Sequence, residues 1–160
     1  MMDLSSLVVS SFAIIIPAYI ANAVPVLLRG KHPIDFGRSL RDGKRILGDG
    51  KTFEGFISGL ALGTLAGALF GYVFLSFMLA LGALLGDMVG AFIKRRLGIA
   101  RGRPAPVLDQ LDFVVGALLL LSPFYPISLE QVVVIVLVTP PIHLFTNFLA
   151  YKLKLKSNPW

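Results

Sequence analysis

Cysteine is absent from the 160 residues of this chain, and charged side chains are scarce. The lack of cysteine excludes disulfide bonds and every metal site that needs a thiolate ligand, and it leaves the redox compartment undetermined. Only 15% of the residues are charged, whereas 56% are hydrophobic, a balance far from that of a soluble globular domain. The composition therefore predicts a membrane protein.

Basic residues are missing from most of the chain, because all fifteen Lys and Arg side chains fall within residues 29–51, 94–103 and 152–156. The formal net charge of +6 by itself would favour nucleic acid or anionic lipid as a partner. The aromatic residues lie in the apolar segments and do not interleave with the basic ones, as stacking platforms for bases would. The pattern thus favours lipid headgroups or a small anion over nucleic acid.

Five apolar segments approach the ~20 residues that a membrane-spanning helix needs. They predict an all-α integral membrane protein, built as a single transmembrane domain over residues 1–160. Pro17, Pro25 and the pair Pro140–Pro141 are expected to bend the first and last spans. The first segment lacks a basic flank and a cleavage signal, so we interpret it as a span and not as a removable signal peptide. The predicted spans are residues 7–28, 53–72, 73–93, 108–126 and 130–151, with cytoplasmic loops at 29–52 and 94–107.

The distribution of Lys and Arg over the loops predicts the orientation. The loop after the first span holds seven, the loop after the third holds five and the tail holds three, whereas the N-terminal segment and the other two turns hold none. By the positive-inside rule, the N-terminus lies outside and the C-terminus in the cytoplasm. We therefore expect a multi-pass protein of the cell membrane whose active site faces the cytoplasm.

A glycine recurs every four residues in the second predicted span, and the third span repeats the theme. Four-residue spacing places such glycines along one helix face, where backbones can approach closely. We expect the second and third spans to pack against each other through these faces, because a tight turn near Tyr72 already joins them. A homodimer seam is the alternative. The glycines are Gly55, Gly59, Gly63, Gly67 and Gly71, then Gly82, Gly86 and Gly90.

Three acidic residues near the cytoplasmic ends of the spans are suited to a cation. Asp87 lies within the third span, where a carboxylate at the helix centre costs ~2.5–3.5 kcal/mol, so it is a functional candidate. An ion pair with Lys94, seven residues on and on the same face, is the alternative. Asp109 and Asp112 share a face of the fourth span, although acids are also ordinary near a helix N-terminus. Because Mg²⁺ prefers oxygen ligands, we predict that Asp87, Asp109 and Asp112 bind one or two Mg²⁺ ions.

The segment Gly48–Thr52 opens the second span with glycines, a lysine and a hydroxyl group, which suit a phosphate at a helix N-terminus. It is not a Walker A loop, because the glycine required six residues before Lys51 is Arg45 and no strand precedes it. Thr52 is equally a candidate for the helix N-cap, and the two roles are compatible.

Other polar features receive no catalytic role from the sequence. His143 and Asn147 lie four residues apart in the fifth span, and we interpret them as packing residues. The alternating basic and apolar residues of the tail 152–156 are interpreted as an anchor for lipid headgroups. Asp35, in the first basic loop, stays unassigned.

These motifs, taken in order, resemble those of the membrane CTP:phosphatidate cytidylyltransferases. Gly86–Asp87, Lys94–Arg96 and Asp109–Asp112 are similar to the signature of that superfamily, and Lys51–Gly55 is similar to its K-T-x-E-G element. The archaeal branch, the CDP-archaeol synthases, resembles this chain most, because it has similar runs at 33–37, 46–52 and 101–106. The resemblance covers about residues 20–120. The bacterial pattern differs, since its serine four residues after the aspartate is Ala91 here and its Lys-Asp pair and His-Gly-Gly run are absent.

The resemblance implies transfer of a cytidylyl group from CTP to an archaeal ether-lipid phosphate, 2,3-bis-O-geranylgeranyl-glycerol 1-phosphate, which yields a CDP-activated lipid and pyrophosphate. It assigns Mg²⁺ to the three carboxylates named above. The catalytic residues that it implies are Asp87, Lys94, Asp109 and Asp112. The CTP phosphates are expected on Lys51, Thr52, Lys94, Arg95 and Arg96.

Two other functions stay open from the sequence. A CTP-dependent polyprenol or phytol kinase shares features of the superfamily but would transfer the terminal phosphoryl group to an alcohol. A small cation transporter would use Asp87 as its intramembrane site, although the outer halves of the second to fourth spans hold almost no ionisable groups for an ion path.

Overall fold

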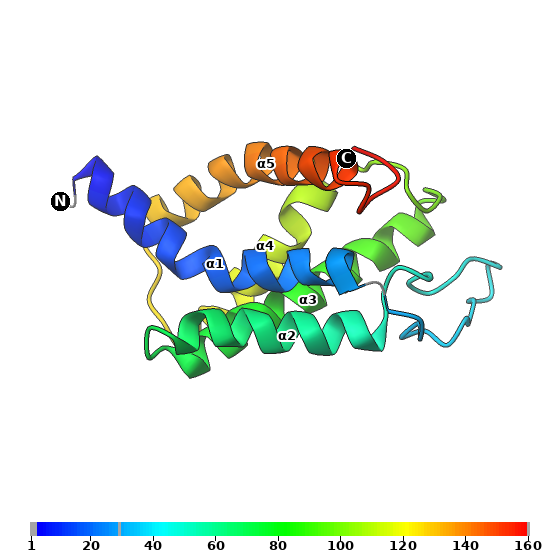
Figure 1. The fold of residues 1–160 in the computed structure, drawn as a ribbon, viewed down its shortest axis with the longest axis horizontal. Helices are drawn as coiled ribbons and strands as arrows, with labels where there is room; N and C mark the ends of the chain where they lie inside the picture. The colour runs from blue at the N-terminus through cyan, green and yellow to red at the C-terminus, as the bar shows by residue number, and fades with distance from the viewer. Residues whose placement is uncertain (1–2, 29, 160) are drawn as a thin grey trace.

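The computed structural model describes residues 3–28 and 30–159, and it confirms the predicted all-α fold class (Figure 1). Within those residues the only β-structure consists of isolated bridges, which join Pro33 to Thr52 and Ser39 to Arg45. The five helices are α1 (Leu4–Leu28), α2 (Phe53–Ala68), α3 (Val73–Arg96), α4 (Leu108–Leu121) and α5 (Leu129–Lys152).

Three of these helices, α1, α3 and α5, are long and apolar enough to cross a membrane. Helices α2 and α4 have 16 and 14 residues, so they measure ~24 Å and ~21 Å, less than the ~30 Å hydrocarbon core of a bilayer. Both are shorter than the predicted spans. Gly71 takes a left-handed φ of 82° in the turn after α2, and α4 ends before Pro123, a residue that disfavours helix ahead of it. The prolines inside α1 and α5 interrupt neither helix.

The glycines of α2 make intramolecular contacts, as predicted, but chiefly with α1. A methyl group added to Gly59 would lie 2.6 Å from the carbonyl oxygen of Ala21, and one added to Gly63 would lie 2.8 Å from that of Pro17. The same methyl on Gly63 would also lie 2.8 Å from Ala80 of α3. The row of glycines therefore lies where three helices meet, with α1 against Gly59 and α3 against Gly67, where an added methyl group would collide with Ser76.

The glycines of α3 face α4. A methyl group on Gly82 would lie 2.5 Å from the carbonyl oxygen of Gly116, which shows how closely the two backbones approach. The predicted packing of the second span against the third is confirmed at Gly63 and Gly67, which meet Ala80 and Ser76 of α3, but the glycines of α3 themselves face α4. Small residues continue this close packing in the core, which includes Ala18, Ala21, Ala80, Ala83, Ala117, Phe113 and Val114.

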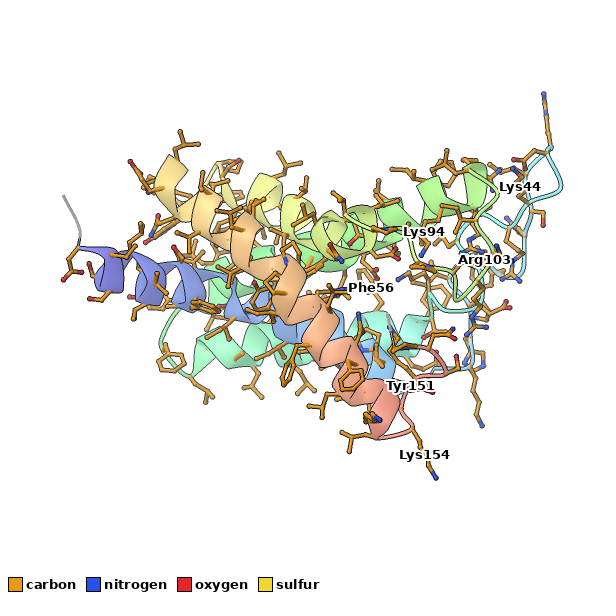
Figure 2. The ribbon with its side chains drawn as sticks, turned by 90° about the horizontal axis from the view of Figure 1, so that it is seen from above. Lys44, Phe56, Lys94, Arg103, Tyr151 and Lys154 are labelled. Atoms are coloured by element: carbon orange, nitrogen blue, oxygen red, sulfur yellow. The ribbon has the colours of Figure 1, made fainter. Side chains whose placement is uncertain are left out.

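One end of the bundle gathers the basic segments. Figure 1 places the loop 30–52, the connection 97–107 and the tail after α5 at this end, and the turns 69–72 and 122–128 at the other. Figure 2 shows the labelled side chains of Lys44, Lys94 and Arg103 at the same end. The clustering predicted from the sequence is thus retained in three dimensions, and the site lies at this end.

Candidate functional site

Two glycines of α3 bring Asp112 into the site. A methyl group on Gly90 would collide with the carboxylate of Asp112, and one on Gly86 would collide with its carbonyl oxygen. Because neither glycine has a side chain, the carboxylate of Asp112 lies against the backbone of α3, next to the turn that carries Asp87. Its Oδ1 also accepts the N–H of Phe113 at 2.7 Å.

Two lysines pair with the other carboxylates. The ammonium of Lys51 donates to the carboxylate of Asp87, and each of these side chains is 24% exposed. The ammonium of Lys94 donates to both oxygens of Asp109, at 2.8 and 2.9 Å, and to the carbonyl oxygen of Arg103 at 3.0 Å. Asp87 is thus neutralised by a lysine from the first basic loop, and Asp109 by a lysine from the end of α3.

The alternative ion pair between Asp87 and Lys94 was wrong. Residues seven apart in a helix share a face but lie ~10.5 Å apart along its axis, beyond the reach of a direct pair. Lys94 instead reaches across to Asp109 of α4, whose carboxylate also accepts the N–H of Ala105 at 2.8 Å. Asp109 therefore fastens the 97–107 connection to α3 as well as presenting a carboxylate.

The three carboxylates have the donor chemistry that Mg²⁺ requires. The charges of Asp87, Asp109 and Lys51 all act on Asp112, which places each of these groups within electrostatic range of that carboxylate. Within residues 3–28 and 30–159, no three acidic or histidine side chains converge closely enough to hold an ion. The carboxylates of Asp87 and Asp109 are turned towards their lysines. Rotation of these carboxylates would replace the contact with the lysine ammonium by a contact with a metal ion. The assignment of Mg²⁺ to these residues stays a prediction, and their carboxylate oxygens are suitable ligands for it.

The first basic loop positions Lys51 through main-chain contacts with the segment after α1. The N–H of Ile34 donates to the carbonyl of Lys51 at 2.8 Å, and the N–H of Phe53 donates to that of His32 at 3.0 Å. The imidazole of His32 pairs with Glu54 at 2.5 Å. These contacts hold Lys51 at the entrance to α2, where its side chain meets Asp87.

Thr52 is the N-cap of α2, as one of its two predicted roles required. Its hydroxyl oxygen accepts the N–H of Gly55 at 3.2 Å, and the residue is buried. Contact of the same hydroxyl with a phosphate stays a prediction. Its motif neighbour Lys51 forms an ion pair with Asp87, and Glu54 is hydrogen-bonded to His32, so every polar residue of the K-T-x-E-G element has a partner.

Arg95 and Arg96 differ in their surroundings. Arg96 donates to Asp42 at 2.6 Å and to the carbonyls of Lys44 and Arg45, so it ties the first basic loop to the end of α3. Among the described residues, the buried Nε atoms of Arg95 and Arg96 both have no hydrogen-bond partner, which leaves donors suited to an anion. The assignment of both arginines to CTP stays a prediction.

Asp35, unassigned from the sequence, organises the loop that carries Lys51. Its side chain is 0% exposed and accepts the guanidinium of Arg45 at 2.6 and 3.2 Å. It also accepts the N–H groups of Gly37, Leu47 and Gly48 at 3.1, 3.0 and 2.9 Å. A buried, fully satisfied carboxylate of this kind fixes the path of the chain. The only sequence signal was an acid ten residues before an arginine in a loop.

The electrostatic environment keeps Asp35 ionised. Burial by itself raises the pKa of this carboxyl, but the guanidinium of Arg45 and three backbone N–H groups outweigh it and hold the pKa well below the ordinary value. A lowered pKa in the folded state means that the charge stabilises the fold above the ordinary aspartate value of ~3.9. That stabilisation is lost as the pH falls below this value.

Asp35→Asn is expected to destabilise the first basic loop by about 1–3 kcal/mol and to raise the KM for the nucleotide, because an amide group would face buried donors. Hydrogen exchange of residues 30–52 measures the first effect. Asp42→Asn is the matched control, since Asp42 pairs with Arg96 but its side chain is 41% exposed. Equal protection of the loop in the two variants would show that Asp35 does not organise it.

The chain is similar to known proteins in both sequence and structure. A sequence profile of the CDP-archaeol synthases (CarS-like) matches residues 4–74 and 66–160. The chain is 48% identical to the CDP-archaeol synthase of Pyrococcus furiosus, over 96% of this chain and 98% of that protein. It is 51% identical to the enzyme of Thermococcus gammatolerans, over 91% and 92%. A solved structure of an intramembrane enzyme for archaeal membrane lipid biosynthesis superimposes with a TM-score of 0.81 and 45% identity, over 88% of this chain and 94% of that one.

Proposed function

Since the chain belongs to the CDP-archaeol synthase family and is a membrane cytidylyltransferase of archaeal lipid biosynthesis, we propose that it uses CTP and Mg²⁺ to activate 2,3-bis-O-geranylgeranyl-glycerol 1-phosphate. The family that the motifs predicted is confirmed. The observation that carries the proposal is the cluster of three carboxylates and two lysines at the basic end of the bundle.

The reaction joins two polyanions and needs charge neutralisation more than acid–base chemistry. An oxygen of the lipid phosphate attacks the α-phosphorus of CTP. The bond from that phosphorus to the oxygen between the α- and β-phosphates breaks, and pyrophosphate leaves with this oxygen. Because the attacking oxygen is already anionic, no general base is required. Positioning the two phosphates in line and stabilising the charge on the departing pyrophosphate are the tasks left to the protein.

The lysines of the site perform the second task. In the structure Lys51 and Lys94 offset the charges of Asp87 and Asp109. When CTP binds, their ammonium groups turn to its phosphates, and the unpaired Nε of Arg95 adds a third donor. The released carboxylates of Asp87 and Asp109, together with Asp112, would hold Mg²⁺, which would supply positive charge against the phosphates.

The membrane arrangement follows from the same end of the bundle. We place the five helices in the cell membrane with the N-terminus outside and the basic end in the cytoplasm, where soluble CTP and a membrane-bound lipid can meet. Helices α2 and α4, which are shorter than a bilayer core, lie against longer neighbours. The glycines of α2 and α3 contact α1 and α4, so a homodimer would use other surfaces.

Product analysis tests this function. Purified protein with labelled CTP, Mg²⁺ and geranylgeranylated glycerol phosphate is expected to form CDP-lipid and pyrophosphate, and chelation of the metal is expected to stop the reaction. A polyprenol kinase would instead form lipid phosphate and CDP from an alcohol, and a cation transporter would form no product. Absence of CDP-lipid across a panel of lipid phosphates would reject the proposal.

A further inference from the structure

The tail after α5 turns back towards the bundle (Figure 1). The N–H of Leu155 donates to the carbonyl of Ala150 at 2.8 Å, and the N–H of Lys154 donates to that of Tyr151 at 2.9 Å. This pair of bonds is the Schellman motif, in which Lys154 takes a left-handed φ of 59°. Glycine is usual at that position, and another residue costs ~1–2 kcal/mol there. The reversal is therefore a specific feature of the fold.

Two side-chain contacts hold the reversed tail. The ammonium of Lys156 donates to the amide oxygen of Asn147 in α5 at 2.8 Å. The amide of Asn158 donates to the carbonyl of Gly102 at 3.2 Å, in the connection that leads to Asp109. Lys156 thus points towards α5, and the interpretation of the tail as a headgroup anchor stays a prediction.

A row of polar side chains links the tail to the catalytic cluster. The amide nitrogen of Asn147, a buried residue, lies 3.1 and 3.2 Å from the two ring nitrogens of His143. The ring of His143 in turn stacks on Phe113, with centroids 6.3 Å apart and planes at 28°. Phe113 directly follows Asp112 in α4. Lys156, Asn147 and His143 thus extend from the tail to the neighbour of a predicted metal ligand.

The charges of the site act on Lys156. Burial lowers the pKa of its ammonium, the carboxylate of Asp109 raises it, and the ammonium groups of Lys94 and Lys51 lower it. Lys156 therefore stands within electrostatic range of both lysine–carboxylate pairs, although it comes from the opposite end of the sequence.

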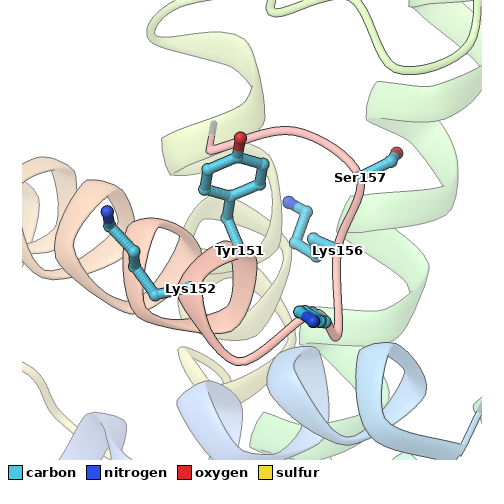
Figure 3. A pocket seen from close by; sticks show the side chains of 5 residues that line it. Tyr151, Lys152, Lys156 and Ser157 are labelled. Carbon is cyan, nitrogen blue, oxygen red and sulfur yellow. The ribbon is translucent and has the colours of Figure 1, made fainter.

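An open cavity of about 470 Å³ lies beside Lys156, a size within the ~300–1,000 Å³ of small-molecule sites. In Figure 3 the side chain of Lys156 lies inside the bend of the tail, whereas Ser157 points outward. Figure 2 shows Lys154 pointing away from the bundle. The cavity is lined by Tyr151, Lys152, Lys154, Lys156 and Ser157.

Large apolar side chains lead to this cavity along the outer surface of α5. A helix face of this kind in a membrane protein contacts lipid chains, and Tyr and Lys near its end mark the level of the headgroups. A lipid whose chains lie along α5 would therefore bring its phosphate to the height of the tail. The exposed residues are Leu144, Phe145, Phe148, Leu149 and Tyr151.

We propose that Lys156, held in place by Asn147, binds the phosphate of the acceptor lipid. This inference rests on the proposed function and names a residue for its second substrate. CTP enters from the water-facing loops, where Lys51 and Arg95 lie, whereas Lys156 stands at the end of the lipid-facing helix. When the acceptor binds, the ammonium exchanges the amide oxygen of Asn147 for a phosphate oxygen, which places the attacking group on the α5 side of the carboxylates.

Steady-state kinetics in mixed micelles test this assignment. Lys156→Gln is expected to raise the KM for the lipid phosphate about tenfold, the loss of one charge-assisted contact, and to leave the KM for CTP within about twofold. Lys156→Arg is expected to restore most of the affinity. Lys31→Gln removes the same charge from an exposed lysine of the first basic loop, outside the cavity, and is expected to change the lipid KM less than about threefold.

Glycerol 1-phosphate serves as a soluble probe of the same site. It is expected to inhibit the wild-type protein in competition with the lipid and not with CTP, and to inhibit Lys156→Gln more weakly. Equal effects of the Lys31 and Lys156 variants would show general attraction by basic residues and overturn the assignment, as would a raised KM for CTP alone. If the wild-type protein forms no CDP-lipid, the proposed function fails; if it does and the variant keeps its lipid KM, only the role of Lys156 fails.

Discussion

Asp112→Asn is expected to lower turnover about 10³-fold while the protein stays folded. Asp112 of α4 lies directly against the backbone of α3, at Gly86 and Gly90. The amide keeps the size of the side chain but cannot carry the negative charge that a cation and two polyphosphates require. Initial rates of CDP-lipid formation measure the effect, and a thermal melt in detergent reports folding.

Glu130→Gln is the matched control for this change. Glu130 is an exposed carboxylate in the first turn of α5, at the end of the bundle away from the site. Its replacement is expected to leave turnover within about twofold, as surface changes do. Near-normal activity of Asp112→Asn would remove Asp112 from the metal site and leave Asp87 and Asp109 as its candidates.

Lys51→Gln is expected to lower kcat/KM for CTP about 10²–10³-fold, equivalent to ~2.7–4 kcal/mol of transition-state stabilisation. Lys51 is the ion-pair partner of Asp87 and lies at the entrance to α2. Because the lysine competes with a cation for that carboxylate, the same variant is expected to bind Mg²⁺ more tightly in the absence of CTP. Kinetics and calorimetric titration with Mg²⁺ therefore change in opposite directions.

This divergence separates a role in the site from damage to the fold. A variant with a collapsed site would lose both CTP turnover and metal binding. Lys31→Gln, an exposed lysine of the same loop, is expected to change neither quantity by more than about twofold. Weaker Mg²⁺ binding by Lys51→Gln would show that Lys51 supports the metal site rather than competing with a cation there.

Several features of the fold could be predicted because they depend on neighbours in the sequence. Hydrophobic runs determine where helices form, and the positions of five of them followed from the sequence, with errors at the ends of α2 and α4. Those two ends lie shortly before Gly71 and Pro123, whose local backbone preferences stop a helix inside an apolar run. Capping by Thr52 was likewise predictable, since it involves a residue only three positions away.

Pairing of the charges could not be predicted in the same way. The sequence places Asp87 and Lys94 on one helix face, but each side chain finds a nearer partner on another element. Which partner is nearer depends on how closely α3 and α4 approach and on where the first basic loop returns to α2. Sequence spacing contains neither distance.

By itself the sequence determined the family, the helical class and the end of the molecule that carries the basic residues, because motif order, hydrophobicity and charge are properties of the chain. Tertiary structure alone decided that α3 glycines admit Asp112, that Asp35 organises the loop of Lys51, and that Lys156 turns inward to Asn147. Each depends on contacts between segments distant in sequence. Their strength falls steeply with distance, so only the packed fold reveals which of them form.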